Sequence, residues 1–174
     1  TLQAPFWTPQ CHQHIGARRY DRRQHQKLGL QTRRHATDTN TDALDRIPFL
    51  KLLGMQQHEA ALGRSRLCLP DLREEFCNLI PAAHGGVLMT LLDVAMARAA
   101  TSLDSAASHS VVTVEMSTRF IKPGRGPLTA EGRVLHAGKS LCSCEAYVHD
   151  ADGDLVASAM GTFKFWRSPP VDVE

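Results

Sequence analysis

The sequence has no apolar run that reaches the ~18 residues of a membrane-spanning helix, because Asp93 and Arg98 interrupt the longest one. It also has no apolar segment of the secretory type near its first residue, so no secretory signal is expected. Neither charge sign dominates, since the formal net charge is only +2 over 174 residues. These features favour a cytoplasmic protein of one domain, with no membrane partner and enough chain to bury a core.

Cysteine is scarce as well: the chain has five, an odd number without the regular spacing of a disulfide framework. Cys142 and Cys144 form a C-x-C with His149 close behind, but no second ligand pair has the spacing of a zinc site. Two cysteines on a strand are more often small apolar side chains. We therefore expect reduced thiols, no metal and no cofactor.

Acidic residues are nearly absent from the first 37 positions, where Asp21 stands against seven Lys and Arg. Residues 1–40 form a basic extension without sustained periodicity. A nucleic-acid arm and an Arg-rich transit peptide are two interpretations, but the pattern favours a flexible extension with no nucleic-acid partner. Residues 41–168 are then the folded domain, and residues 169–174 form a short tail.

The folded domain combines helical and strand patterns. Apolar spacing predicts a helix from Thr41 to Leu53, capped by Thr41 or Asp42 and ended by Gly54, and a second helix from Val87 to Ala100. Strands are predicted at 55–70, 111–121, 128–137, 141–149 and 155–166, the last two joined by a turn at 150–154. Short connections favour antiparallel pairing, so we expect an α+β fold in which one sheet wraps one helix.

The segment "AAHGGVLMTLLDVAMARAA", residues 82–100, contains the most informative pattern. Its helix is apolar on nearly every side and should be buried all round. Gly85 and Gly86 at the helix start would let a ligand approach unpaired backbone N–H groups, where the helix dipole favours a developing oxyanion. Met89, Leu92 and Met96 are expected to line a pocket beside this helix.

Asp93 lies two turns into the same helix without a cation in helical register, since Arg98 is five residues away. Burying an unpaired carboxylate costs several kcal/mol, so something must compensate it. A salt bridge to Arg119 or a hydrogen bond to Thr113 would be a structural answer, and a catalytic base is the functional one. Alternation at 111–121 places Thr113 on the face of Glu115, opposite Val114 and Met116.

Together these residues resemble the hotdog-fold acyl-CoA thioesterases of the phenylacetate-degradation (PaaI-like) type. The resemblance rests on the helix motif "HGGVLMTLLDVA" and on the strand segments "VTVEMSTRFIKPGRG", "GKS" and "DGDLVASAMGTFKF", and it spans about residues 45–166. It implies a hotdog fold, in which a curved antiparallel sheet wraps a long central helix. It also implies an acyl-CoA substrate and a homodimer or homotetramer.

The resemblance further assigns roles to single residues. Asp93 matches the catalytic carboxylate, acting as general base on water or as nucleophile, and Gly85 matches the glycine whose N–H polarises the thioester carbonyl. Asn78 and His84 match the pair that positions thioester and water. Thr113 matches a residue that holds the attacking water from across the dimer interface. One departure is Pro81, where the family commonly has a glycine.

Coenzyme A, the carrier of the acyl group, contains phosphate groups. Two segments with basic residues match those that contact this carrier in the family. Basic side chains in turns are usually only solvated, so the assignment of these residues to carrier binding rests on the match to the family segments. The carrier-binding candidates are Phe120, Lys122, Arg125, His136, Gly138, Lys139 and Ser140, with Arg133 nearby.

Two rival functions stay open from the sequence. A hotdog enoyl-thioester hydratase or dehydratase would use a similar helix with a different acid–base pairing. A non-catalytic acyl-CoA-binding protein would bind the ligand without turnover. Hydrolysis of an aryl, short or medium-chain acyl-CoA is the favoured prediction.

Overall fold

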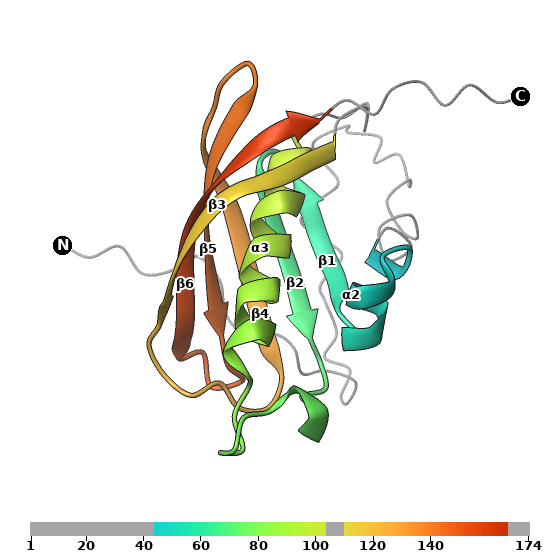
Figure 1. Cartoon of the computed structure of the whole chain (residues 1–174), viewed down its shortest axis with the longest axis vertical. Coiled ribbons are helices and arrows are strands. Elements are labelled where there is room, and N and C mark those ends of the chain that lie inside the picture. The colour runs from blue at the N-terminus through green and yellow to red at the C-terminus, as the bar shows by residue number, and fades with distance from the viewer. Residues whose placement is uncertain (1–43, 104–109, 167–174) are drawn as a thin grey trace, which may run out of the picture.

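The computed structural model describes residues 44–103 and 110–166 (Figure 1). In these ranges Leu44 and Asp45 are helical, and they are followed by two further α-helices, one short 3-10 helix and six strands. Their bounds are α2 (Pro48–Leu53), β1 (Gln56–Ala61), β2 (Arg64–Leu69), η1 (Glu74–Phe76), α3 (Gly85–Thr101), β3 (Ser110–Phe120), β4 (Leu128–Ala137), β5 (Leu141–His149) and β6 (Leu155–Trp166). The expected extension 1–40 and tail 169–174 lie outside the described residues.

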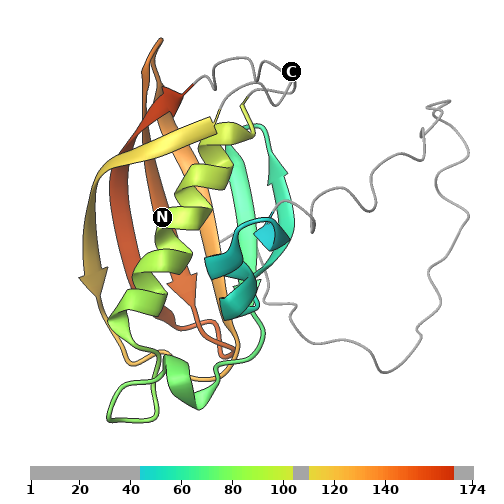
Figure 2. The same cartoon turned by 45° about the vertical axis from the view of Figure 1, so that its right-hand side comes forward.

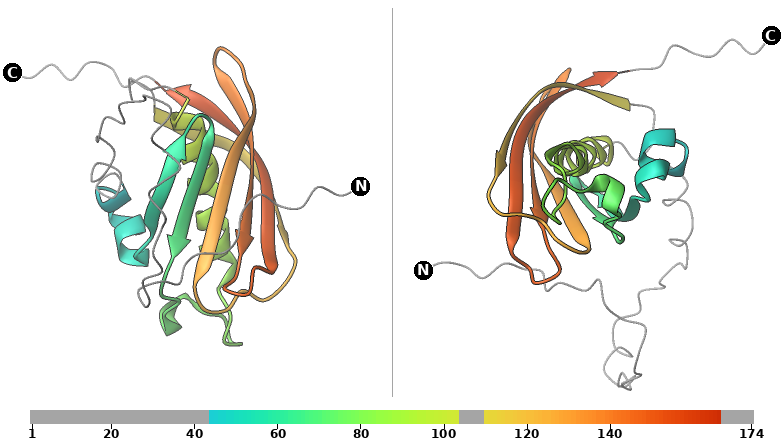
Figure 3. Two further views of the ribbon diagram at one scale, coloured as in Figure 1. Left: turned by 180° about the vertical axis from the view of Figure 1, so that it is seen from behind. Right: turned by 60° about the horizontal axis from the view of Figure 1, so that its bottom comes forward.

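The six strands form one antiparallel sheet in the order β1-β2-β4-β5-β6-β3. This sheet curves around α3, which lies along its concave face (Figures 2 and 3). The arrangement confirms the predicted α+β hotdog fold. None of the helices in the described ranges is both long and apolar enough to cross a bilayer.

The core lies between α3 and the concave face of the sheet. One side of the helix is fully buried, including Leu91, Leu92 and Met96, and it packs against inward side chains such as Ala146 and Phe163. Burial of this apolar surface is the main favourable term in folding. The shared core fixes α3, and therefore every side chain that α3 carries, relative to the strands.

Gly132 on β4 allows α3 to approach the sheet closely. A Cβ atom at this position would overlap the backbone carbonyl of Ala95 on the helix. Ser65 on β2 donates its hydroxyl to the same carbonyl, with 2.6 Å between Oγ and O. The middle of α3 is thereby held against β2 and β4 by a backbone contact and a buried hydrogen bond.

The prediction of a single strand at 55–70 is wrong, because the segment is the β1–β2 hairpin. Leu62 and Gly63 form its two-residue turn, and both have positive φ angles of 51° and 77°. Such turns match the twist of the flanking strands but usually contain Asn or Asp before the glycine. Leu62 gives no such signal, so the turn was missed.

The first predicted helix is interrupted, because Leu44 and Asp45 are helical but a turn at residues 46–47 separates them from α2. Helix α2 begins with Pro48 at a first-turn position, where a missing N–H costs nothing, and has no side-chain cap. Gly54 ends the helix with a φ of 72°, as predicted. The predicted caps Thr41 and Asp42 lie outside the described residues.

Helix α3 is not buried all round, which corrects the expectation from its composition. Met89 is 41% exposed, and Asp93, Val94 and Ala97 are only half-buried. These residues follow the helical spacing of one stripe, which faces away from the sheet. The outer stripe is where the candidate active site lies.

Candidate active site

Asp93 and Thr113 form the centre of the candidate active site. The Thr113 hydroxyl donates a hydrogen bond to the Asp93 carboxylate, with 2.7 Å between Oγ1 and Oδ1. Among the described residues no cation lies within salt-bridge distance of Asp93, so the alternative of a pair with Arg119 is not realised. The hydrogen-bond partner of the carboxylate is therefore a neutral hydroxyl and not a cation.

A bulge in β3 explains how Thr113 reaches Asp93. Thr113 pairs with Phe163 and Glu115 with Thr162, so Val114 is an extra residue in the strand. This insertion turns Thr113 to the concave face of the sheet, the same face as Met116. The prediction that Thr113 shares a face with Glu115 is therefore wrong, and the hydrogen bond to Thr113 that was weighed from sequence forms within one chain.

Asp93 and Thr113 line a cavity of about 480 Å³ between α3, β3 and the segment around α2. Its walls are mainly apolar, with Phe49, Val94 and Met116 among them. Of the three expected pocket residues only Met89 lines it, because Leu92 and Met96 point into the core. A carboxylate at the wall of an apolar cavity suits binding of an apolar acyl group beside an activated water.

The start of α3 supplies a second polar centre. His84 is the N-cap, and its Nδ1 accepts a hydrogen bond of 3.0 Å from the Gly86 N–H. No acceptor for the Gly85 N–H is found among the described residues. The Phe120 ring lies against Gly85, since a Cβ there would be 3.4 Å from Cζ. His84 therefore caps the helix, and Gly85 presents its N–H at the positive end of the helix.

Asn78 is exposed in the loop that precedes α3. Its backbone N–H donates to Ala82 O at 2.9 Å, and its side-chain Nδ2 donates to Ala83 O at 3.2 Å. An antiparallel bridge between Cys77 and Ala83 closes the same loop around Pro81. These bonds fix Asn78 next to the helix start, on the side of Gly85 rather than on that of Asp93.

One chain does not bring Gly85 and Asp93 together. They are eight residues apart on α3, which corresponds to about 12 Å along the helix axis. A carbonyl group in contact with the Gly85 N–H therefore cannot also lie next to Asp93 of the same chain. The candidate site consists of two halves, with Asn78, His84 and Gly85 in one and Asp93 and Thr113 in the other.

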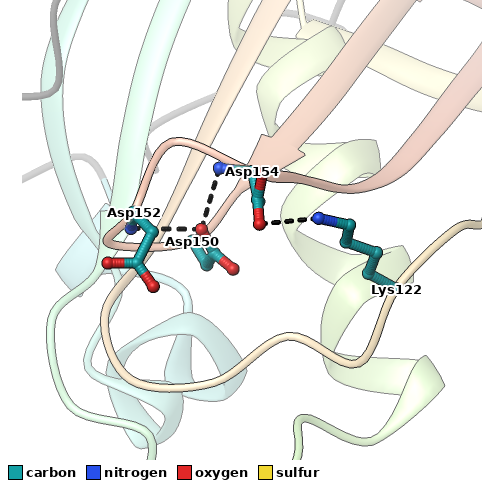
Figure 4. Close-up of polar contacts among 4 residues, drawn as sticks. All are labelled: Lys122, Asp150, Asp152 and Asp154. Carbon is teal, nitrogen blue, oxygen red and sulfur yellow. Dashed lines mark hydrogen bonds and ion pairs between the residues drawn. The ribbon is translucent and has the colours of Figure 1, made fainter.

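The first carrier segment lies at the helix-start end of the molecule, where Lys122 forms an ion pair with Asp154 (Figure 4). The Nζ and Oδ2 atoms are 2.6 Å apart, and this hydrogen bond raises the pKa of Lys122. Asp150 organises the same turn by accepting the backbone N–H groups of Asp152 and Asp154. The carboxylates of Asp154 and Asp150 thus act on Lys122 and offset its charge, and Arg125 is exposed.

The second carrier segment lies at the other end of the sheet. His136, Gly138, Lys139 and Ser140 are all exposed in and around the β4–β5 turn. Strand β4 has ten residues, so the two carrier segments of one chain are separated by roughly 30 Å. Arg133, also at this end, forms an ion pair with Glu145.

Sequence reasoning missed Arg98 as a residue of the cavity. Arg98 lines the cavity together with Asp93, and its Nε donates to Oε1 of Gln57 on β1 at 2.5 Å. Burial lowers the pKa of the Arg98 guanidinium from its ordinary value. The sequence showed only that Arg98 could not reach Asp93, and the contact with β1 depends on tertiary packing.

The cysteines take no part in this site. Cys142 and Cys144 are buried with their Sγ atoms 3.5 Å apart, and burial raises the pKa of both thiols. Cys77, Cys142 and Cys144 are free thiols. No group of three or more His, Cys, Asp or Glu in the described ranges is placed to hold a metal ion.

Comparison with known proteins identifies the class. The family "Thioesterase superfamily" matches residues 81–157. A protein of Saccharolobus solfataricus, named as a candidate esterase, is 33% identical over 121 residues, which cover 69% of this chain and 84% of the relative. The chain belongs to the thioesterase superfamily, and the predicted enzyme class, a thioester hydrolase, is confirmed at that level.

Solved structures agree with this classification. A thioesterase family protein from Silicibacter pomeroyi has a TM-score of 0.66 and 26% identity, covering 73% of this chain and 95% of its own. A conserved protein from Pseudomonas aeruginosa has a TM-score of 0.63 and 31% identity, covering 68% and 93%. The E. coli PaaI protein of the phenylacetic acid degradation operon shares the fold, with a TM-score of 0.65 and 24% identity over 75% and 91%.

Proposed function

We propose that this chain is a PaaI-type acyl-CoA thioesterase that hydrolyses an acyl-CoA to the free acid and coenzyme A, without a metal or redox cofactor. The observation that carries this proposal is the Asp93–Thr113 hydrogen bond at the wall of an apolar cavity, in a member of the thioesterase superfamily. The carboxylate has no cationic partner among the described residues, and it lies where an acyl group would fit. These are the properties that a general base or nucleophile requires.

The reaction needs only one activated oxygen and one polarised carbonyl. As general base, Asp93 takes a proton from water while the water oxygen bonds to the thioester carbon. The C–S bond then breaks, and the proton passes to the leaving thiolate. As nucleophile, the Asp93 oxygen itself bonds to that carbon, and water hydrolyses the resulting anhydride. In both routes Thr113 orients the carboxylate through its hydroxyl.

The N–H of Gly85 is the proposed donor to the carbonyl oxygen. It lies at the positive end of α3, and the neighbouring Gly86 N–H is already bonded to His84. Asn78 and His84 flank this donor, and we assign them the positioning of thioester and water. Because Gly85 and Asp93 of one chain are about 12 Å apart along the helix, the carbonyl bound by one chain would be attacked from another.

A homodimer with antiparallel α3 helices satisfies this requirement. Two helices that cross near Met89, which lies midway between Gly85 and Asp93, bring Asp93 of each copy to Gly85 of the other. Met89 is exposed on the outer stripe, and β3 is an edge strand with exposed Val112 and Val114. An unpaired apolar edge favours pairing with a second chain. The dimer contains two equivalent sites, and a homotetramer would pair two such dimers.

Carrier binding is proposed at the segments predicted from sequence. Arg125 with Phe120 lies near Gly85, where the thioester would end, and Lys139 with His136, Gly138 and Ser140 lies at the opposite end of the chain. In a dimer with antiparallel helices the second segment of one copy approaches the first segment of the other. Lys122 contributes once its ion pair with Asp154 opens.

Thiol release from a panel of aryl, short, medium and long acyl-CoAs tests the proposal, with Asp93→Asn as the matched variant. We expect turnover of at least one acyl-CoA and a loss of about 10³-fold or more in kcat for Asp93→Asn. Water addition to an enoyl-CoA without thiol release would favour a hydratase instead. Tight binding without turnover would favour a binding protein.

A further inference from the structure

The cavity that contains Asp93 also contains a cation. Arg98 lines it on the C-terminal side of Asp93, away from Gly85, and the two are the only charged residues among the described residues of its lining. They are five residues apart, which corresponds to about 7–8 Å along the helix axis. An acyl group whose carbonyl lies at Asp93 would extend along this wall toward Arg98.

Arg98 is held in place by the sheet rather than by solvent. Its Nε donates to Gln57 Oε1 at 2.5 Å, and Gln57 is only 7% exposed. A guanidinium carries five N–H donors in a planar fork, so it can serve more than one acceptor at once. The bond to Gln57 therefore fixes the orientation of the fork at the cavity wall.

Gln57 adds a second unusual feature at this place. Its Nε2 is buried and has no hydrogen-bond partner among the described residues, although a buried amide donor without a partner costs free energy. Buried polar groups are nearly always satisfied, and exceptions point to a missing water, ion or ligand. The half-buried Arg98 and the unpartnered Gln57 amide lie side by side, joined by their hydrogen bond.

From this arrangement we infer that Arg98, oriented by Gln57, selects acyl groups that carry a carboxylate at the end remote from the thioester. The inference rests on the proposed thioesterase function and names its substrate class, the coenzyme A monothioesters of short dicarboxylic acids. A carboxylate matches the planar guanidinium in shape and charge. The apolar walls of the cavity suit the methylene groups between the two ends.

The matched substrates are succinyl-, glutaryl- and adipyl-CoA against butanoyl-, pentanoyl- and hexanoyl-CoA, which have the same chain lengths without the terminal carboxylate. The measured quantity is the ratio of kcat/KM values within each pair. We expect the wild-type chain to prefer at least one dicarboxylic member by about tenfold or more. Arg98→Met should abolish this preference by lowering kcat/KM for the dicarboxylic substrate, with the neutral substrate unchanged or faster.

Two further variants separate recognition from folding. Gln57→Glu keeps the Arg98 side chain and its hydrogen bond but neutralises its charge, so it should also remove the preference. Arg119→Met removes an exposed arginine from β3, outside the cavity, and should leave the preference intact. Thermal unfolding of each variant verifies that the fold is retained. If Arg98→Met does not fold, the substrate preference of Gln57→Glu tests the role of Arg98 instead.

A binding measurement keeps this inference distinguishable from the proposed function. Calorimetry with the Asp93→Asn variant compares glutaryl-CoA with pentanoyl-CoA whether or not the wild-type chain turns either over. Tighter binding of glutaryl-CoA, lost on adding Arg98→Met, supports the inference even if catalysis fails. Equal binding of both ligands, or a wild-type preference for the neutral substrates, overturns it even if the chain is an active thioesterase.

Discussion

Thr113 donates a 2.7 Å hydrogen bond to Asp93 of the same chain, across the gap between the edge strand β3 and the outer stripe of α3. The bond joins one carboxylate oxygen of Asp93 to β3 at the wall of the cavity that both residues line. The orientation of the proposed base is therefore set within one subunit.

Replacing Thr113 by Val should lower kcat by about tenfold, because the carboxylate loses its orienting donor while the side-chain volume is kept. Thr113→Ser keeps the hydroxyl and should retain most of the activity. The measurement is the rate of thiol release at saturating acyl-CoA for both variants. Equal rates in the Val variant and the wild type would show that the hydroxyl has no part in catalysis.

The Gly85 N–H can be removed without removing the helix start. Proline is compatible with the first helical position, and the preceding His84 has φ −61° and ψ 142°, which suits a residue before proline. Gly85→Pro should therefore keep the fold and lower kcat by about 10²–10³-fold through loss of an oxyanion donor.

Gly85→Ala is the matched control for this experiment. Its Cβ would meet Phe120 Cζ at 3.4 Å, an ordinary contact that proline shares, and its N–H is retained. We expect Gly85→Ala to keep most of the wild-type kcat. If both variants lose activity equally, crowding by Phe120 is responsible and the N–H is not.

Stability depends on the close approach of α3 to β4 at Gly132. Gly132→Ala would place a methyl group on the Ala95 carbonyl and force helix and strand apart, which should lower the free energy of unfolding by about 3 kcal/mol or more. Gly138→Ala, in the β4–β5 turn, meets only Leu141 O at 3.4 Å and should have little effect. Urea unfolding of both variants measures the difference, and similar midpoints would contradict the packing described here.

The ion pair between Lys122 and Asp154 makes a distinct prediction for carrier binding. Asp154→Asn releases Lys122 and removes one of the two carboxylates that act on it, so KM for acyl-CoA should fall, most clearly at low salt. Lys122→Ala should raise KM and weaken its salt dependence. The thermal midpoint of both variants should stay unchanged, because the pair is exposed. An unchanged KM in both variants would remove Lys122 from the carrier site.

Much of this fold could be predicted because local signals agree with the tertiary structure. Strands β4, β5 and β6 have the predicted bounds, since alternating side chains end at turns rich in Gly and Asp. The β1–β2 turn was missed because Leu62 adopts a left-handed conformation that its side chain does not favour. Arg98 was missed because its neighbours in the cavity come from distant segments, which no spacing within the helix can indicate.

The bulge in β3 is another feature that local sequence patterns do not indicate. Its role can be tested by deleting the extra residue. The residues from Val111 to Phe120 alternate as a regular strand would, so no local pattern marks Val114 as the inserted residue. Deleting Val114 should restore a regular ladder with β6 and leave every other pair in place, including Thr113 opposite Phe163. Thr113 should then stay on the concave face, beside Asp93.

The deletion variant should therefore keep most of the wild-type kcat, unlike Thr113→Val, because Thr113 stays opposite Phe163 and retains its hydrogen bond to Asp93. Thiol release and thermal unfolding of the two variants, measured side by side, provide the comparison. A folded deletion variant with full kcat would show that pairing with Phe163 is sufficient to place the Thr113 hydroxyl at Asp93. A folded deletion variant that loses as much kcat as Thr113→Val would show that the bend introduced by the extra residue is also needed to orient the base.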